Sequence, residues 1–108
     1  MYRLDITRDA MKSIESLQTK QYRQVVTKVF SLMKDARPSD AQQLRDSDYW
    51  RVDVGEFRIV YRNDKEFLYI HVIGKRNDGE VYKDLARKQV AERIRNTART
   101  QANKRPER

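Results

Sequence analysis

Arginine is the residue type on which any chemistry of this 108-residue chain would depend. Arg51, Arg58 and Arg62 lie in two segments where polar and apolar residues alternate, so all three are expected, together with Asp53, on one face of a β-hairpin. Like charges on one face repel each other unless an anion joins them, and a phosphodiester is an anion that arginine holds with a bidentate fork. The pattern therefore favours a phosphate-binding face. The alternative is a solvated face with exposed ion pairs, each worth about 0–1 kcal/mol.

Tyr82 is the candidate for a proton-transfer step. It lies six residues after Arg76, and Lys75-Arg76 follow the next apolar segment. RNA carries its own nucleophile, the 2′-hydroxyl, so a protein that positions the phosphate and stabilises the charge of the transition state could cleave RNA without a metal. The other interpretation of Tyr82 is a base-stacking platform or an amphipathic residue at the rim of the sheet.

Other catalytic groups are scarce. The chain has no cysteine and one histidine, His71, which lies within an apolar run and is interpreted as a structural residue. Asp46, Asp48 and Asp53 could offer oxygens to Mg²⁺, but such residues are more typical of turns before a strand. We therefore expect no metal, no cofactor and no small-molecule ligand.

The positive charge is unevenly distributed. The formal net charge is +8, but residues 1–82 hold 15 Lys and Arg against 13 Asp and Glu, a net charge of +2, whereas residues 83–108 hold 9 against 3, a net charge of +6. Phosphate affinity in the first part must therefore come from local placement of arginines. The last part is expected to supply salt-dependent attraction to an anionic partner such as RNA.

The length and the N-terminal sequence suggest one domain in the cytoplasm. A chain of this size forms one small domain, and the absence of cysteine suits a reducing compartment. The N-terminal residues are too charged for a signal peptide, and no stretch approaches the ~20 apolar residues that a membrane span needs. We expect a cytoplasmic protein with no membrane partner.

The elements that must position these residues follow from hydrophobic periodicity. Residues 2–6 alternate as a strand does, and residues 10–17 and 19–33 have the spacing of two helices, with Thr7 and Thr19 as candidate N-caps. Pro38 is expected to follow the end of the second helix.

Three extended segments come next, at residues 50–54, 57–62 and 67–73, with Gly55-Glu56 and residues 63–65 as turns. The last segment is apolar at nearly every position, as in a central strand that is covered on both faces. A short extended piece at 80–82 and a basic helix follow. The predicted fold is a single α+β domain with an N-terminal strand, a helical hairpin, an antiparallel sheet and a C-terminal helix.

Two stretches resemble a known family. The sequence LRDSDYWRVDVGEFRIVYR, residues 44–62, and the sequence FLYIHVIGKRNDGEVYK, residues 67–83, are similar to the RelE branch of the RelE/ParE toxin superfamily, and the element order resembles that family over residues 2–85. The resemblance implies a toxin of a type II toxin–antitoxin system. Such a toxin enters the ribosomal A site and cuts the bound mRNA by metal-independent attack of the 2′-hydroxyl. The implied domain covers residues 1–84, followed by a basic C-terminal helix and frayed tail at 85–108.

The resemblance also assigns residues. The implied catalytic residues are Arg51, Arg58, Arg76 and Tyr82, and the implied RNA-binding residues are Arg45, Arg62, Lys75 and Lys83. Asp53 is a departure, because the nuclease prototype of the family has a lysine there, and the general base is left open; Arg62 or Lys83 could compensate. The implied partners are a cognate antitoxin, which would contact residues 83–94, the ribosome and mRNA.

Two alternatives share the same fold. One is a protein of the ParE type, which poisons DNA gyrase without nuclease chemistry, and the other is a nucleic-acid-binding module that lost activity through Asp53. The complete trio of Arg58, Arg76 and Tyr82 favours the nuclease.

Overall fold

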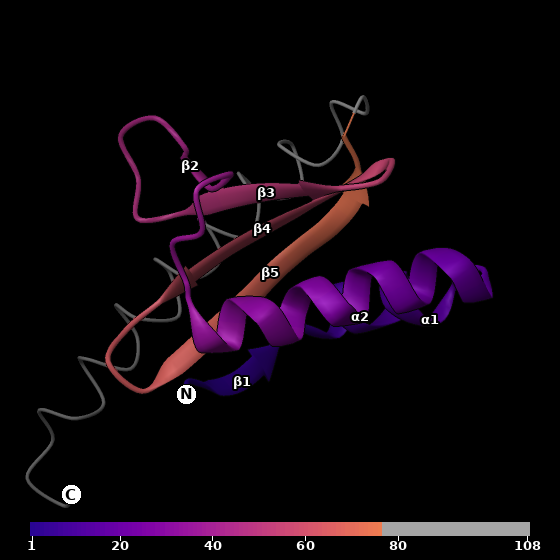
Figure 1. Ribbon diagram of the computed structural model, residues 1–108, viewed down its shortest axis with the longest axis horizontal. Coiled ribbons are helices and arrows are strands. Elements are labelled where there is room, and N and C mark those ends of the chain that lie inside the picture. The colour runs from indigo at the N-terminus through magenta and orange to yellow at the C-terminus, as the bar shows by residue number, and fades with distance from the viewer. Residues whose placement is uncertain (77–108) are drawn as a thin grey trace, which may run out of the picture.

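A helical hairpin packs on one face of a five-stranded sheet in the computed structural model, which describes residues 1–76 (Figure 1). The elements are β1 (Arg3–Ile6), α1 (Arg8–Glu15), α2 (Thr19–Lys34), β2 (Gln42–Gln43), β3 (Trp50–Val54), β4 (Phe57–Asn63) and β5 (Phe67–Lys75). The predicted α+β class is confirmed. The predicted strand at 80–82, the C-terminal helix, the domain boundary after residue 84 and the antitoxin contact at 83–94 lie outside the described residues.

The sheet is mixed, with the strand order β1-β5-β4-β3-β2. Strands β3 to β5 pair antiparallel, as predicted, and β2 pairs antiparallel with β3, whereas β1 pairs parallel with β5, and Leu4 lies opposite Leu68. Parallel neighbours need a long connection between them, and here the helical hairpin and strands β2 to β4 supply it. Strand β2, two residues long, was not predicted, because its glutamines carry no hydrophobic pattern.

The helix ends show one correct and one wrong cap prediction. Thr7 caps α1 as predicted: its hydroxyl oxygen accepts a hydrogen bond from the backbone N–H of Ala10 at 3.1 Å and donates one to the carbonyl of His71 at 2.8 Å. Thr19 is not a cap but the first residue of α2, because Gln18 already has the extended backbone of the cap position. Helix α2 ends at Lys34, before Pro38, as predicted.

The core lies between α2 and the sheet. Its fully or almost fully buried members alternate along the strands, which confirms the faces predicted from period 2. They include Val25, Val29 and Leu32 of α2 together with Val52, Ile59, Tyr61, Leu68, Ile70 and Ile73 of the sheet. The Tyr61 hydroxyl donates a 2.6 Å hydrogen bond to the carbonyl of Ala36, so the one polar tip in this set has a partner.

A β-bulge changes the facing of β5 halfway along the strand. Val60 lies opposite Val72, but Tyr61 lies opposite Ile70, so His71 is the extra residue. Ile70 and Ile73 therefore both belong to the helix-side core, while Val72 packs with Val60 and Tyr49 on the other face. Both faces of β5 are buried, as predicted for a central strand.

Candidate phosphate-binding face

The predicted basic residues of the hairpin lie on the sheet face opposite the helices. Arg51 lies opposite Val60, and Asp53 lies directly opposite Arg58, in register positions that alternate with the core residues of β3 and β4. Arg62, further along β4, lies opposite Tyr69 of β5. The period-2 argument therefore places all three arginines on one face, although their roles stay predictions.

Asp53 and Arg58 form a side-on ion pair. The Nε atom of Arg58 donates to Oδ1 of Asp53 at 2.7 Å, and the Nη2 atom donates to Oδ2 at 3.2 Å. The Arg58 side chain is 14% exposed and the Asp53 side chain 36%. This is the two-point geometry in which arginine holds planar anions best.

Two further arginines act on the same carboxylate. The hydrogen bond from Arg58 lowers the pKa of Asp53 below its usual value, and the charges of Arg58, Arg51 and Arg76 lower it further. Arg76 is fixed near the hairpin, because its backbone N–H donates a 2.9 Å hydrogen bond to the carbonyl of Glu56 in the β3–β4 turn. The structure thus brings Arg58 into contact with Asp53 and places Arg51 and Arg76, two further predicted catalytic residues, near enough for their charges to act on it. The Nη2 group of Arg51 itself donates to Oε1 of Gln42 on β2.

The bulge explains why Arg76 belongs with Arg58. We call the sheet face that carries Arg51, Arg58 and Arg62 the arginine face. Gly74 lies opposite Arg58 on this face only because the extra residue His71 shifts the alternation of β5 by one residue. Arg76 follows Lys75, the last residue of β5, and would lie on the same face as Gly74 if the alternation continued. Without the bulge, the same alternation would direct Arg76 towards the helices.

The remaining predicted RNA-binding residues are dispersed. Arg62 stacks over the Tyr69 ring with its guanidinium carbon 4.1 Å from the ring centre, four residues along β4 from Arg58. Arg45 is in the loop before β3 with its side chain 97% exposed, beside Asp46 at 3.8 Å. Lys75 lies opposite Phe57, a residue packed on the helix-side core, so its register position is on the other face. Tyr82 and Lys83 lie outside the described residues.

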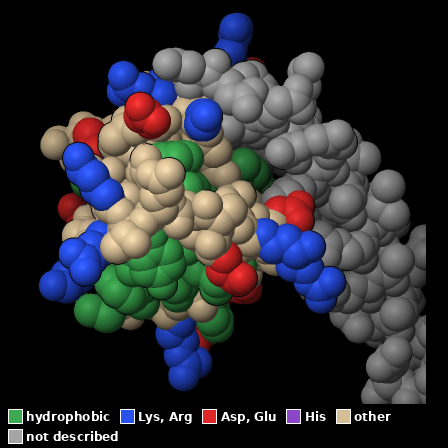
Figure 2. All heavy atoms as spheres, turned by 90° about the vertical axis from the view of Figure 1, so that its right-hand side faces the viewer, with side chains coloured by type: hydrophobic (Ala, Val, Ile, Leu, Met, Phe, Trp, Pro, Cys, Tyr) green, Lys and Arg blue, Asp and Glu red, His purple; other side chains and the backbone are tan. Residues whose placement is uncertain are grey.

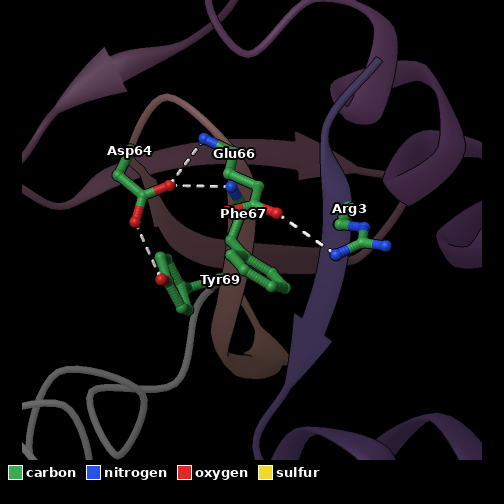
Figure 3. Close-up of polar contacts among 5 residues, drawn as sticks. All are labelled: Arg3, Asp64, Glu66, Phe67 and Tyr69. Carbon is green, nitrogen blue, oxygen red and sulfur yellow. Dashed lines mark hydrogen bonds and ion pairs between the residues drawn. The ribbon is translucent and has the colours of Figure 1, made fainter.

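Residues at the β4–β5 turn have structural roles. The Asp64 carboxylate accepts hydrogen bonds from the backbone N–H groups of Glu66 and Phe67 and from the Tyr69 hydroxyl, and Arg3 of β1 pairs with Glu66 at 3.2 Å (Figure 3). These contacts fix the turn and orient the ring on which Arg62 stacks. Asp64 is therefore a turn-forming residue.

Within residues 1–76, no three acidic or histidine side chains are grouped so that they could hold a metal ion. His71 is buried, with its ring edge-on to Tyr49 at 4.8 Å between centroids. The interpretation of His71 as a structural residue is consistent with this position at the bulge.

The contact between Asp53 and Arg58 is the feature that sequence reasoning missed. A two-residue turn at Gly55-Glu56 pairs residues symmetrically about itself, so Val54 lies opposite Phe57 and Asp53 lies opposite Arg58. Gly55 has a φ of +57°, the left-handed geometry that glycine adopts without strain. The turn signal and the opposite charges were therefore sufficient to predict this pair.

Removing the Asp53 charge should destabilise the protein in a pH-dependent way. The Asp53 pKa is lower in the folded state than the usual value of 3.8, so the pair contributes stability above about pH 4 and loses it as the pH falls through the folded pKa. Asp53→Asn should reduce the free energy of unfolding by about 1 kcal/mol at pH 7, a small value because the carboxylate is partly exposed. Urea unfolding at neutral and acidic pH measures this. The difference from the unmodified protein should shrink in acid, and a constant difference would show that the charge is irrelevant.

Comparisons with known proteins bear on the fold. No protein-family model and no curated protein matches this sequence. Solved structures do match: a double mutant of Escherichia coli RelE in the free state gives a TM-score of 0.69 at 21% identity, covering 81% of this chain and 96% of that one. RelE in the archaeal RelE–RelB complex of Pyrococcus horikoshii gives a TM-score of 0.63 at 23% identity, covering 69% and 94%.

YafQ of E. coli, at 13% identity, gives a TM-score of 0.59 and covers 71% of this chain and 96% of that one. The helical hairpin on one face of a five-stranded sheet thus belongs to the class of small α+β folds that these solved structures share. Within that class, the chain has the RelE fold.

Proposed function

We propose that this chain is the toxin of a type II toxin–antitoxin system and acts as a ribosome-dependent endoribonuclease on mRNA. The fold shared with RelE and YafQ toxins supports the toxin class. The observation that carries the nuclease is the two-point contact of Arg58 with the Asp53 carboxylate on the sheet face, where the charges of Arg51 and Arg76 also lower the pKa of Asp53. A phosphate group is an anion that such a cluster would bind.

In the proposed reaction, the RNA supplies the nucleophile. The 2′-hydroxyl attacks the adjacent phosphorus, a base takes its proton, the bond to the 5′-oxygen breaks, and that oxygen receives a proton as it leaves. The products are a 2′,3′-cyclic phosphate and a 5′-hydroxyl. Arg58 and Arg76 would stabilise the negative charge on the non-bridging oxygens, Arg51 would position the phosphate, and Tyr82 would serve one of the two proton transfers.

The proposed partners are a cognate antitoxin, the ribosome and the mRNA in the ribosomal A site. The proposed location is the cytoplasm. Structures of RelE with the antitoxin RelB, from P. horikoshii and other species, support an antitoxin partner. The net charge of +6 on residues 83–108 would attract the chain to ribosomal RNA or to an acidic antitoxin. Among residues 1–76, neither helix is long and apolar enough to cross a membrane.

A gyrase-poisoning toxin of the ParE type is the second candidate, and it is not favoured. The similar solved structures described above are RelE and YafQ toxins.

Expression of the protein in bacterial cells, with parallel mapping of mRNA 5′ ends and DNA breaks, tests the proposal. Codon-phased mRNA cuts are expected, and Arg76→Ala or Tyr82→Phe should relieve growth arrest while antitoxin binding is kept, because each removes one group from the reacting phosphate. Loss of toxicity in both variants with intact folding supports the assignment. Double-strand DNA breaks without mRNA cuts, or full toxicity of both variants, would contradict it.

A further inference from the structure

Asp53 is an anion at the centre of a cluster that is proposed to bind an anion. We propose that it is an internal counter-ion, which occupies Arg58 in the free protein and competes there with the phosphate of RNA; this inference rests on the proposed function. The competition follows from the contacts, the exposure and the neighbouring charges of these residues.

The contacts use the edge of Arg58 that a phosphate would use. Nε and Nη2 donate to the two carboxylate oxygens at 2.7 and 3.2 Å. Two non-bridging phosphate oxygens fit the same pair of donors. A phosphate that takes this edge must therefore displace Asp53 from at least one hydrogen bond, because the two anions also repel each other.

The exposure of the two side chains shows which of them can move. Arg58 is 14% exposed and Asp53 36%, although they lie directly opposite each other on adjacent strands. A carboxylate at this exposure can exchange its protein hydrogen bonds for water, whereas the more deeply buried guanidinium is held in place. Displacement by a ligand would therefore turn Asp53 outward and leave Arg58 where it is.

The neighbouring positive charges explain why a carboxylate at this position is favourable when no RNA is bound. Arg51 is two residues away on the same face of β3, where its Nη2 donates to Gln42 of β2, and Arg76 is anchored at the β3–β4 turn through its 2.9 Å backbone hydrogen bond to Glu56. Three guanidinium groups at such a site repel one another in the absence of an anion. Asp53 relieves that repulsion, and for the same reason it weakens the attraction of the cluster for any other anion.

The test is the affinity of Asp53→Asn for two probes, a 2′-O-methyl RNA oligonucleotide, which cannot be cleaved, and inorganic pyrophosphate. The variant should bind both about three- to fivefold more tightly than the unmodified protein at low salt, the effect of releasing one partly exposed ion pair. Asp5→Asn is the matched control, because Asp5 is an exposed residue of β1 on the same face. Two strands separate it from β3, a distance of about 14 Å.

The outcomes separate local competition from overall charge. A gain in Asp53→Asn that exceeds the gain in Asp5→Asn, and that disappears when Arg58→Ala is added, supports the proposal. Equal gains in the two single variants, or weaker binding by Asp53→Asn, would overturn it.

A second measurement uses the unmodified protein, so it does not depend on how the variants fold. When pyrophosphate is titrated in, NMR should show the Arg58 Nε signal and the Asp53 carboxyl carbon signal shifting together. A shift of Arg58 alone would refute displacement. Asp53→Asn could bind pyrophosphate more tightly while the unmodified protein shows no ribosome-dependent mRNA cleavage. That result would support this inference and reject the proposed function.

Discussion

Replacing Arg58 by alanine is expected to slow mRNA cleavage on programmed ribosomes by about 100- to 1,000-fold, the usual effect of removing one donor to a charge that develops in the transition state. Arg58 is held by burial, since its side chain is 14% exposed, and its Nε and Nη2 donors already bind a planar anion, the Asp53 carboxylate. A fixed donor contributes more than a mobile one because no reorganisation is needed as the charge develops. Single-turnover cleavage rates at saturating toxin measure this loss directly.

The control for Arg58→Ala is Arg3→Ala, which removes one positive charge from the same sheet face. Arg3 is an exposed residue of β1 and pairs with Glu66, far from the β3–β4 hairpin. Its replacement should change the cleavage rate by less than about threefold, because exposed ion pairs contribute little. Equal losses in the two variants would mean that the overall charge of the face matters and the position of Arg58 does not. Urea unfolding of both variants would exclude a folding defect.

Arg58→Lys separates charge from geometry at the same position. Lysine keeps one positive charge but cannot form the two parallel hydrogen bonds that Nε and Nη2 of Arg58 form with Asp53. A variant nearly as slow as Arg58→Ala would show that the planar fork is what the reaction uses.

The sequence was sufficient to predict the positions of Arg51, Arg58 and Arg62 on one face. Period-2 alternation fixes the face of every residue in a regular hairpin, and the turn at Gly55 fixes the register. The cap at Thr7 was equally local, since its hydroxyl needs only the N–H three residues later. Such features depend on neighbours in the sequence, so the sequence can show them.

The position of Arg76 could not be predicted in this way. It depends on the bulge at His71, which places Gly74 opposite Arg58, and the apolar run 67–73 contains no polar residue pattern that marks a change of face. The parallel pairing of β1 with β5 is likewise a tertiary property, because it depends on where the helical hairpin delivers the chain. The position of Arg76 therefore depends on long-range packing, whereas the local sequence pattern is sufficient for Arg51 and Arg58.

The packing of the core between α2 and the sheet also holds the arginine face in a fixed geometry. The central strands β4 and β5 carry core residues towards α2, and Ile59 and Ile70 are fully buried there. Figure 2 shows a patch of hydrophobic side chains in the lower part of one end of the molecule, with basic and acidic side chains around the edge of that view. Because the same strands carry the arginines, a loss of packing under the sheet would lower the fraction of molecules that hold a folded site.

Leu32→Ala should lower the free energy of unfolding by about 3–4 kcal/mol, because Leu32 is a fully buried leucine of α2 and its truncation leaves a cavity in a close-packed core. Alanine favours helix at least as well as leucine, so the loss would come from packing alone. A small domain has only about 5–15 kcal/mol in total, so this change should reduce folded toxin in cells and weaken growth arrest.

Phe30→Ala on the same helix is the matched control for Leu32→Ala. Phe30 is 56% exposed, and its replacement should stay within about 0.5 kcal/mol of the unmodified protein, because the small loss of contact is offset by the better helix propensity of alanine. Urea unfolding gives both values, and the cleavage rate per folded molecule should be unchanged in both variants. A comparable destabilisation by Phe30→Ala would mean that the outer face of α2 is covered in solution. A Leu32→Ala protein as stable as the original would show that α2 does not support the sheet as described.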